Sequence, residues 1–182
     1  MVTKSDAIFL SETWLCTDDT GEDLQITGFK LKLNSVGPGR GLATYFKADK
    51  FHHSGDVKDA KFQLTKISSK TLDIISMYRS ADSKLDTIEE NLLNLIDVEK
   101  TTIICGDFNI CFKSERNNRL IKTIEDQGFQ QLNKEATHFA AGHIDHIYVN
   151  GQAHADVSLY SPYYCAKDHD ALLEISVSIL NI

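Results

Sequence analysis

An aspartate and an asparagine two positions apart carry the first candidate chemistry. Asp107 and Asn109 lie in the segment GDFN, directly after the apolar stretch 101–105. Alternate side chains of an extended segment share a face, so these two would face a cleft while Phe108 packs inward. Gly106 would let the backbone turn tightly before them. A carboxylate beside an amide can activate water and hold a phosphate oxygen, although the tetrapeptide alone is also compatible with a polar turn after a strand.

Two pairs of an acid and a histidine lie further along the chain, each beside an apolar stretch. They are Asp145 with His146, and Asp168 with His169. A histidine beside a carboxylate can act as an acid or hold a phosphate near neutral pH, although the second pair alone also fits a surface loop. Strand alternation places Asp145 and His146 on opposite sides, and an Asp next to an apolar strand needs a partner such as His169.

Two further candidates end apolar stretches earlier in the sequence. Glu12 follows the stretch 7–10, and Tyr78 and Arg79 follow the stretch 72–77. A phenol and a guanidinium at a strand end can both touch phosphate. A single acid or a single tyrosine at such a place is equally typical of a solvated surface, so these residues gain meaning only together with the others.

A zinc centre is the competing reading of the segment that contains His143, Asp145 and His146. Their spacing matches no closed structural zinc pattern, and neighbours on a strand point apart, so zinc ranks low. The cysteines form no CxxC pair and therefore predict neither a zinc knuckle nor a disulfide framework. They are Cys16, Cys105, Cys111 and Cys165.

Strands must position most of these residues. Apolar and β-branched stretches, separated by turn residues, occur at 7–10, 42–46, 62–67, 72–78, 101–105, 144–149, 155–159 and 171–179. The polar residues 68–71 between the third and fourth stretches predict a hairpin. The stretch 101–105 reads as a strand that is buried on both faces.

Two helices accompany the strands. Residues 85–98 carry an apolar stripe at helical spacing, formed by Ile88, Leu92, Leu95 and Ile96. A second helix, which Ser114 would cap and Gly128 would end, buries Leu120, Ile121 and Ile124. Many strands and few helices predict a single α+β domain over residues 1–182, with two packed sheets and helices outside them.

Composition limits the class of protein. The 182 residues are 42% hydrophobic and 25% charged, which is ordinary for a soluble globular domain. No apolar run is long enough to span a membrane, and the first residues lack the features of a signal peptide, so we expect an intracellular protein of the nucleus or cytoplasm. A net charge of −7 argues against a protein that coats DNA, but not against an enzyme that recruits Mg²⁺.

Taken in order, these motifs resemble the endonuclease/exonuclease/phosphatase superfamily, which has the deoxyribonuclease-I-like fold. More narrowly, they resemble the endonuclease domain at the start of non-LTR retrotransposon proteins. The motifs span nearly the whole chain and read SETWL, GRGLATYF, MYR, IICGDFNI, ATH, IDHIYV and SPYYCAKDHDALL. The resemblance implies a four-layer fold in which two sheets form a sandwich flanked by helices.

The resemblance also implies a role for each candidate. Glu12 matches the glutamate that holds Mg²⁺ or Mn²⁺, and Asp168 matches an acid that reaches the metal. Asp107 matches the aspartate that positions or deprotonates the attacking water, and Asn109 the amide that orients phosphate. His169 matches the essential histidine.

Two more matches complete the implied site. Asp145 matches the carboxylate that fixes the tautomer of the essential histidine, and Tyr78 matches a tyrosine that contacts phosphate. The implied partner is the phosphate backbone of DNA, nicked on one strand. We expect replacement of His169 by alanine to lower activity more than the same change at His146.

The chain departs from the family pattern in three places. The family begins with an asparagine-bearing strand ahead of the glutamate strand, and no such segment precedes Glu12, which predicts an N-terminally truncated domain. Lys167 stands where the family usually has serine, and Ser80 and Ala81 stand where it usually has prolines. Two alternatives therefore stay open. One is a phosphatase of the same superfamily that acts on a small phosphorylated substrate, and the other is an inactive remnant that at most binds a partner.

Overall fold

The computed structural model contains, within the residues that it describes, eleven strands and two α-helices. It describes residues 5–16, 18–133, 135–138, 142–150, 153–160 and 172–179, the last two ranges as backbone only. The first strands are β1 (Ala7–Ser11), β2 (Lys30–Asn34), β3 (Leu42–Phe46), β4 (His52–Lys58), β5 (Phe62–Ser68) and β6 (Leu72–Arg79). The remaining strands are β7 (Thr101–Asp107), β8 (Gln130–Gln131), β9 (Asp145–Val149), β10 (Ala153–Tyr160) and β11 (Leu172–Ile179). The helices are α1 (Leu85–Leu95), α2 (Arg119–Asp126) and the short 3₁₀ helix η2 (Glu22–Leu24).

The strands form three hydrogen-bonded sheets. A six-stranded sheet has the order β4-β5-β6-β7-β9-β8, a three-stranded sheet has the order β1-β3-β2, and β10 pairs with β11. Within the six-stranded sheet only β6 and β7 are parallel, joined by a crossover through α1. The hairpin expected from the polar residues between two apolar stretches is confirmed, since β5 and β6 pair antiparallel.

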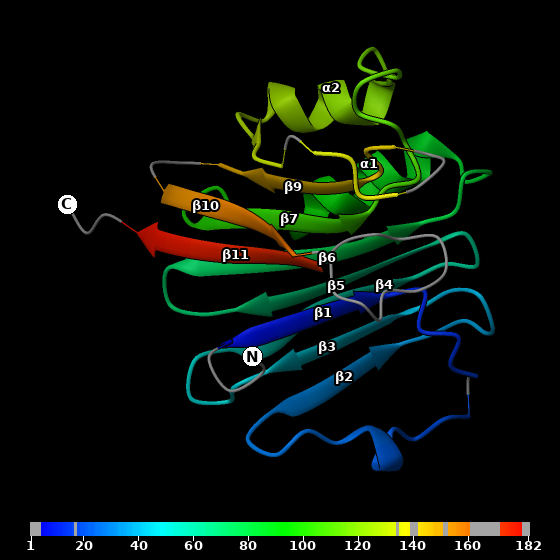
Figure 1. The fold of residues 1–182 in the computed structure, drawn as a ribbon, viewed down its shortest axis with the longest axis vertical. Helices are drawn as coiled ribbons and strands as arrows, with labels where there is room; N and C mark the ends of the chain where they lie inside the picture. The colour runs from blue at the N-terminus through cyan, green and yellow to red at the C-terminus, as the bar shows by residue number, and fades with distance from the viewer. Residues whose placement is uncertain are drawn as a thin grey trace.

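The two larger sheets lie against each other, with α1 and α2 on one outer side (Figure 1). The helices α1 and α2 cover one face of the six-stranded sheet, and the three-stranded sheet covers the other. The 3₁₀ helix η2 lies on the outer side of the three-stranded sheet, where the Tyr45 hydroxyl donates to the Leu24 carbonyl oxygen at 2.8 Å. The fold class predicted from the sequence, an α+β two-sheet sandwich flanked by helices, is confirmed.

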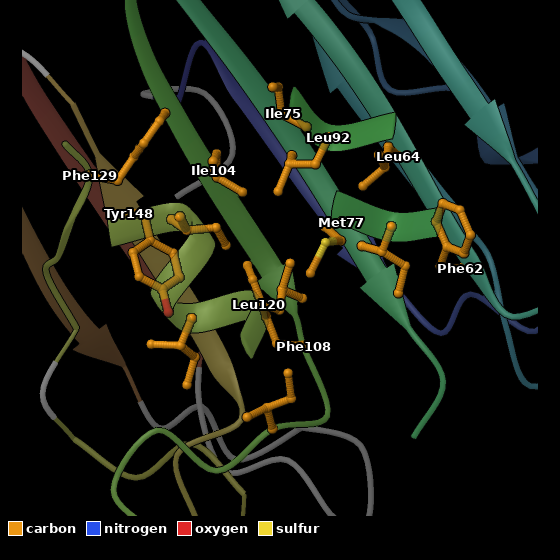
Figure 2. Close-up of a cluster of buried hydrophobic side chains, with 14 residues drawn as sticks. Phe62, Leu64, Ile75, Met77, Leu92, Ile104, Phe108, Leu120, Phe129 and Tyr148 are labelled. Carbon is orange, nitrogen blue, oxygen red and sulfur yellow. The ribbon is translucent and has the colours of Figure 1, made fainter. Parts of the chain in front are cut away.

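Two apolar cores follow from strand alternation. On the helix side, Ile75, Met77, Ile104 and Tyr148 pack with the buried faces of α1 and α2 (Figure 2). On the other side, alternate residues of the same strands pack against Phe46 of the three-stranded sheet. Because both faces of β6 and β7 are covered, these strands read as nearly continuous apolar runs.

The ends of the helices differ from the sequence expectations. Helix α1 ends at Leu95, three residues before the predicted end, although Leu95 and Ile96 still pack on the core. Asn118, not Ser114, caps α2, because its side-chain oxygen accepts from the Leu120 amide at 3.0 Å. Gly128 ends α2 as expected: it adopts φ 82°, and its amide donates to the Glu125 carbonyl oxygen.

Sequence reasoning also missed some strands. It did not predict β2, β4 or β8. The strand expected at 7–10 is present, but it is not buried as expected, since its residues are partly exposed and Leu10 is 40% exposed. The buried strand expected at 101–105 is confirmed and continues to Asp107. Within the described part of the chain, neither helix is both long and apolar enough to cross a membrane.

Candidate active site

Three candidate residues form a row across three neighbouring strands of the six-stranded sheet, at the ends of those strands. Tyr78 of β6 lies opposite Asp107 of β7, which in turn lies opposite Asp145 of β9. Directly opposed residues share a face, and this face is the one covered by the three-stranded sheet. The ends of β6 and β7 and the start of β9 lie on the same side of the molecule as the end of β1, at the right of Figure 1. The row therefore opens where Glu12 follows β1.

Asp107 is 1% exposed, and Asn109 holds its carboxylate. The Asn109 backbone amide donates to Asp107 Oδ1 at 2.9 Å, and the Asn109 side chain donates to Asp107 Oδ2 at 3.2 Å. The same side-chain nitrogen donates to the Arg79 carbonyl oxygen at 2.7 Å. Asn109 reaches this position with a left-handed backbone, φ 48°, which asparagine tolerates better than most residues. The two residues therefore act as one unit, while Phe108 packs into the core as expected.

Gly106 serves close packing of strands more than a tight turn. It is still part of β7, with φ 140°, and a β-carbon there would lie 1.9 Å from the Met77 carbonyl oxygen. No side chain fits at that distance. Glycine at this position therefore lets β6 and β7 approach, and that approach brings Tyr78 beside Asp107.

Glu12 joins the row from the other sheet. The Tyr78 phenol hydrogen-bonds the Glu12 carboxylate, and its oxygen also lies 3.4 Å from the Gly39 carbonyl oxygen. Burial, the negative charges of Glu12 and Asp107, and the bond to Glu12 all raise the pKa of Tyr78 above its ordinary value, and Arg40 acts in the opposite direction. Glu12 has φ 51°, an uncommon backbone conformation for this residue type. Both sheets thus contribute to one acidic site around a protonated phenol.

The backbone of Asp145 is held by two residues that sequence reasoning missed. The Asn133 side-chain amide donates to the Asp145 carbonyl oxygen at 2.6 Å, and the Asp145 amide lies 3.2 Å from Thr137 Oγ1. Thr137 lies within the ATH motif, which was the only signal for this pair. His169 and Asp168, the partners expected nearby, lie outside the described residues, so the expected pairing of Asp145 with His169 stays a prediction.

His146 points away from the row, as strand alternation predicts. Its ring stacks on Phe108 with centroids 4.5 Å apart, and its Nε2 lies 2.8 Å from the Ile110 carbonyl oxygen. Since a carbonyl needs a donor, Nε2 carries the proton and Nδ1 accepts from the Tyr148 hydroxyl at 3.1 Å. Burial and the neighbouring His143 lower the pKa of His146 to about 4. His146 is therefore a neutral core residue.

Arg79 also lies on the helix side of the sheet, against the expectation that it touches phosphate together with Tyr78. Its buried guanidinium donates to the carbonyl oxygens of Phe108 at 2.9 Å, Asn109 at 3.1 Å and Ala81 at 3.1 Å. Consecutive strand residues face opposite sides, which separates it from Tyr78. Its role is to fix the loop that carries Asn109.

The donor atoms of the row fit a hard cation better than zinc. Glu12 and Asp107 both act on the Tyr78 phenol, so carboxylate oxygens from two sheets approach one place. Such oxygens suit Mg²⁺, which uses one or two carboxylates and fills its other positions with water and phosphate. Among the described residues no three His, Cys, Asp or Glu side chains gather where they could hold a metal ion, and His146 faces away from Asp145.

A comparison with known protein families shows to which family the chain belongs. A family model described as endonuclease-reverse transcriptase matches residues 72–173, more than half of the 182 residues. The chain belongs to this family. The matched range contains every candidate except Glu12, which the fold brings to the same site. No curated protein matches the sequence.

Solved structures show that the fold is that of the deoxyribonuclease-I-like superfamily. The endonuclease domain of TRAS1, a telomere-specific non-LTR retrotransposon, is 12% identical with a TM-score of 0.66, over 94% of this chain and 86% of that one. An AP endonuclease from Archaeoglobus fulgidus is 17% identical with a TM-score of 0.66, over 100% of this chain and 91% of that one. A 3′ phosphatase, NExo from Neisseria, is 16% identical with a TM-score of 0.67, over 96% and 89%. At these identities the likeness carries the fold, and the chemistry must be argued from the site.

Proposed function

We propose that this member of the endonuclease-reverse transcriptase family hydrolyses phosphodiester bonds with Mg²⁺ or Mn²⁺ and nicks one strand of DNA. The observation that carries the proposal is the convergence of Glu12, Tyr78 and Asp107 from two sheets at one edge of the sandwich. Membership of the family and the likeness to the TRAS1 endonuclease domain support DNA as the substrate.

Each residue has a distinct part in the hydrolysis. Asp107, held by both amides of Asn109, takes the proton of the attacking water while the water oxygen bonds to phosphorus. The bond from phosphorus to the leaving oxygen breaks, and that oxygen keeps the electron pair and takes up a proton from solvent. The raised pKa of Tyr78 keeps its phenol protonated, so that it donates a hydrogen bond to a phosphate oxygen. Glu12 would hold the divalent ion, which neutralises the charge that develops on the phosphate. In the same proposal Asp145 orients His169, and Asp168 reaches the ion.

Plasmid nicking tests the proposal directly. The chain is incubated with supercoiled plasmid and Mg²⁺, beside Asp107→Asn and a control, Asp126→Asn, at an exposed position of α2. We expect conversion to open circles by the wild type and the control, and a loss of roughly 100-fold or more for Asp107→Asn. Equal rates for all three proteins would contradict the assignment of Asp107. Absence of any Mg²⁺-dependent nicking would favour an inactive remnant.

A phosphatase is the second candidate, because one structural neighbour is described as a 3′ phosphatase bound to product DNA. Release of inorganic phosphate from a 3′-phosphorylated oligonucleotide and from an inositol phosphate distinguishes a phosphatase from a nicking endonuclease. Turnover of either compound while plasmid stays intact would replace nicking with phosphatase activity.

The choice between the two histidines is tested with matched variants. We expect His169→Ala to lower the nicking rate more than His146→Ala, once both rates are corrected for the folded fraction by circular dichroism. The reason is that His146 is bonded to core carbonyls and faces away from Asp107. Equal corrected losses would show that the essential histidine is misassigned.

A further inference from the structure

An exposed tryptophan lies at the rim of the proposed site. Trp14 is 67% exposed and is the only tryptophan of the chain. Its backbone has φ 57°, a left-handed conformation that is a true outlier for so bulky a residue. Strained backbone persists only where surrounding contacts impose it, and it is concentrated at functional sites. An exposed large aromatic ring held in this way requires an explanation other than core packing.

The segment that carries Trp14 is fixed to the glycine-rich loop 37–41 and the residues just before it. The Thr13 amide donates to the Gly41 carbonyl oxygen at 3.4 Å, and Ser35 Oγ donates to the Leu15 carbonyl oxygen at 2.6 Å. Between these bonds the indole lies against Gly39, where an added β-carbon would be 3.7 Å from ring atoms Cη2 and Cζ2. The six-membered ring of the indole thus lies next to the backbone of the loop at Gly39.

The same loop connects the ring to the chemistry. Gly39 presents its carbonyl oxygen to the Tyr78 hydroxyl, and Trp14 follows the proposed metal ligand Glu12 by two residues. Arg40, the next residue of the loop, follows this carbonyl directly, and its Nη1 donates to the Ala60 carbonyl oxygen at 2.7 Å. The loop whose Gly39 carbonyl oxygen lies near the Tyr78 hydroxyl thus carries a guanidinium and packs against an aromatic ring.

We propose that Trp14 stacks on a nucleobase adjacent to the scissile phosphate and that Arg40 contacts a neighbouring phosphate of the same strand. This inference rests on the proposed function, since it assumes that the substrate is DNA. Every base has an aromatic face, so stacking on tryptophan binds a strand without reading its sequence, and arginine adds charge attraction to the backbone. A base that is unstacked next to the cleavage point is the chemical feature recognised.

A purely structural role for Trp14 makes a different prediction. If the ring only pins the loop 37–41, any large apolar side chain should serve. Trp14→Leu keeps apolar volume against Gly39 but removes the aromatic face, whereas Trp14→Phe keeps a smaller aromatic face. Val98→Ala is the control, because Val98 is 84% exposed and lies just before the start of β7, whereas Asp107 lies at its end.

Because Trp14 is the only tryptophan, its fluorescence reports on the site alone. The full chain carrying Asp107→Asn, which we expect to slow cleavage strongly, is titrated without a divalent metal with a ten-nucleotide single-stranded DNA and with the same sugar-phosphate strand lacking bases. We expect strong quenching by the first and little by the second. In a parallel titration followed by polarisation of a labelled strand, Trp14→Leu should raise Kd roughly 5- to 100-fold, and Trp14→Phe should stay within about threefold of the parent.

Kinetics and salt dependence supply independent measurements. In the otherwise wild-type chain, Trp14→Leu should raise KM for DNA more than it lowers kcat, because stacking is made in the ground state as well. Arg40→Gln should reduce the slope of log Kd against log salt by about 1, as expected when one phosphate contact is lost. Val98→Ala should leave Kd, KM and the salt slope unchanged.

The outcomes separate this inference from the proposed function. If plasmid is nicked and Trp14→Leu binds and cleaves as the wild type does, or if Trp14→Phe is as defective as Trp14→Leu, the stacking role is overturned while the nuclease assignment stands. Equal quenching by the strand with bases and the strand without bases overturns it as well. If the wild type neither nicks nor binds DNA, the proposed function fails, and this inference fails with it.

Discussion

The two faces of the six-stranded sheet use polar residues in opposite ways. On the helix side, Asp73, Arg79 and His146 are buried, and each bonds to groups that belong to the fold. On the other side, Tyr78, Asp107 and Asp145 form a row that Glu12 joins from a second sheet. Sequence neighbours such as Tyr78 and Arg79 are divided between the two faces.

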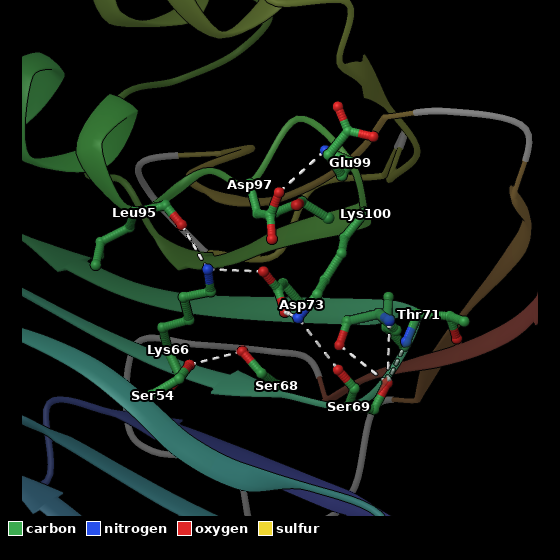
Figure 3. A network of polar contacts seen from close by, with 12 residues as sticks. Ser54, Lys66, Ser68, Ser69, Thr71, Asp73, Leu95, Asp97, Glu99 and Lys100 are labelled. Atoms are coloured by element: carbon green, nitrogen blue, oxygen red, sulfur yellow. Dashed lines mark hydrogen bonds and ion pairs between the residues drawn. The ribbon is translucent and has the colours of Figure 1, made fainter.

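The two buried aspartates make the difference concrete. Asp73 is 0% exposed, with Lys66 Nζ at 2.7 Å and Lys100 Nζ at 3.4 Å (Figure 3). Burial alone would raise the pKa of Asp73, but hydrogen bonds from Lys66 and Ser68 and the two lysine charges outweigh it and lower the pKa. Asp107 is held by neutral amides of Asn109 and lies near a second acid and a phenol. Asp73 is thus paired with two lysines of the fold, whereas Asp107 is bonded to Asn109 and lies opposite the Tyr78 phenol.

The sharpest test of this comparison uses the neighbours Tyr78 and Arg79. Arg79→Met removes three charge-assisted hydrogen bonds and leaves carbonyls of the Phe108–Asn109 loop unpartnered, so we expect the free energy of unfolding to fall by about 4 kcal/mol. Tyr78→Phe should leave stability nearly unchanged but lower the nicking rate at least about tenfold. Urea unfolding and plasmid nicking measure the two effects.

The assignment of Arg79 to stability and of Tyr78 to activity would be wrong if the two variants exchanged their effects. A stable Arg79→Met protein with lost activity would place the guanidinium in the chemistry, and an unstable Tyr78→Phe protein would make the phenol a structural element.

The second test uses the pH dependence of stability on the helix side. His146 has a folded pKa of about 4, below its ordinary value of 6.5, because burial disfavours its charged form. A group with a depressed folded pKa contributes stability above its unfolded pKa and loses it as pH falls toward the folded value. The free energy of unfolding should therefore decline between pH 6.5 and 4, by at most about 3 kcal/mol. Urea unfolding at several pH values checks this.

A matched variant assigns that decline to His146. In His146→Gln the side chain keeps polar atoms for Ile110 and Tyr148 but does not titrate, so the variant should be less pH dependent in this window. An unchanged profile would mean that another group is responsible.

The strands that form the core could be predicted because they are rich in apolar residues, and apolar stretches indicate buried strands. β6 and β7 are mostly apolar on both faces, and the site residues Tyr78 and Asp107 lie at their ends. β4 (HHSGDVK) was missed because it is an edge strand with mostly exposed, polar residues, so alternation gives little signal. The cap of α2 was misplaced because several serine and asparagine residues precede the helix, and only the hydrogen bond from Leu120 selects Asn118.

For the site, the residue types and the alternation of side chains along a strand predicted which residues belong to it. They did not predict which other residues those side chains contact. That Asp145 and His146 face opposite sides follows from the period of a strand. That Glu12 reaches Tyr78 could not be derived, because it depends on how two sheets pack and on the left-handed backbone of Glu12. The support of Asp145 by Asn133 and Thr137 depends on long-range contacts of the same kind.

A smaller loss of stability is expected when Asp73, the buried aspartate of the helix side, is replaced by an uncharged residue. Asp73→Asn keeps the shape of the side chain but removes its attraction to Lys66 and Lys100, and we expect a loss of about 2 kcal/mol. Lys66 keeps its bond to the Leu95 carbonyl oxygen at 2.7 Å, which limits the damage. Since the folded pKa of Asp73 is lowered, the wild-type advantage should persist at neutral pH and disappear as pH falls below about 4. Nicking by the folded fraction should be unaffected.

The smallest loss of stability is expected for Lys100, which makes the weakest contact with Asp73. Lys100 Nζ is 3.4 Å from Asp73 and 3.3 Å from the Ser69 carbonyl oxygen, and its side chain is 26% exposed, whereas the Lys66 side chain is 12% exposed. Water can therefore replace much of what Lys100 provides, and Lys100→Met should lower the free energy of unfolding by less than about 1 kcal/mol. Lys66→Met should have the larger effect, because its short bond to Asp73 is less accessible to water. Equal losses in urea unfolding would mean that the two lysines share the charge of Asp73 evenly, and that the helix-side network depends on total charge rather than on the one close contact.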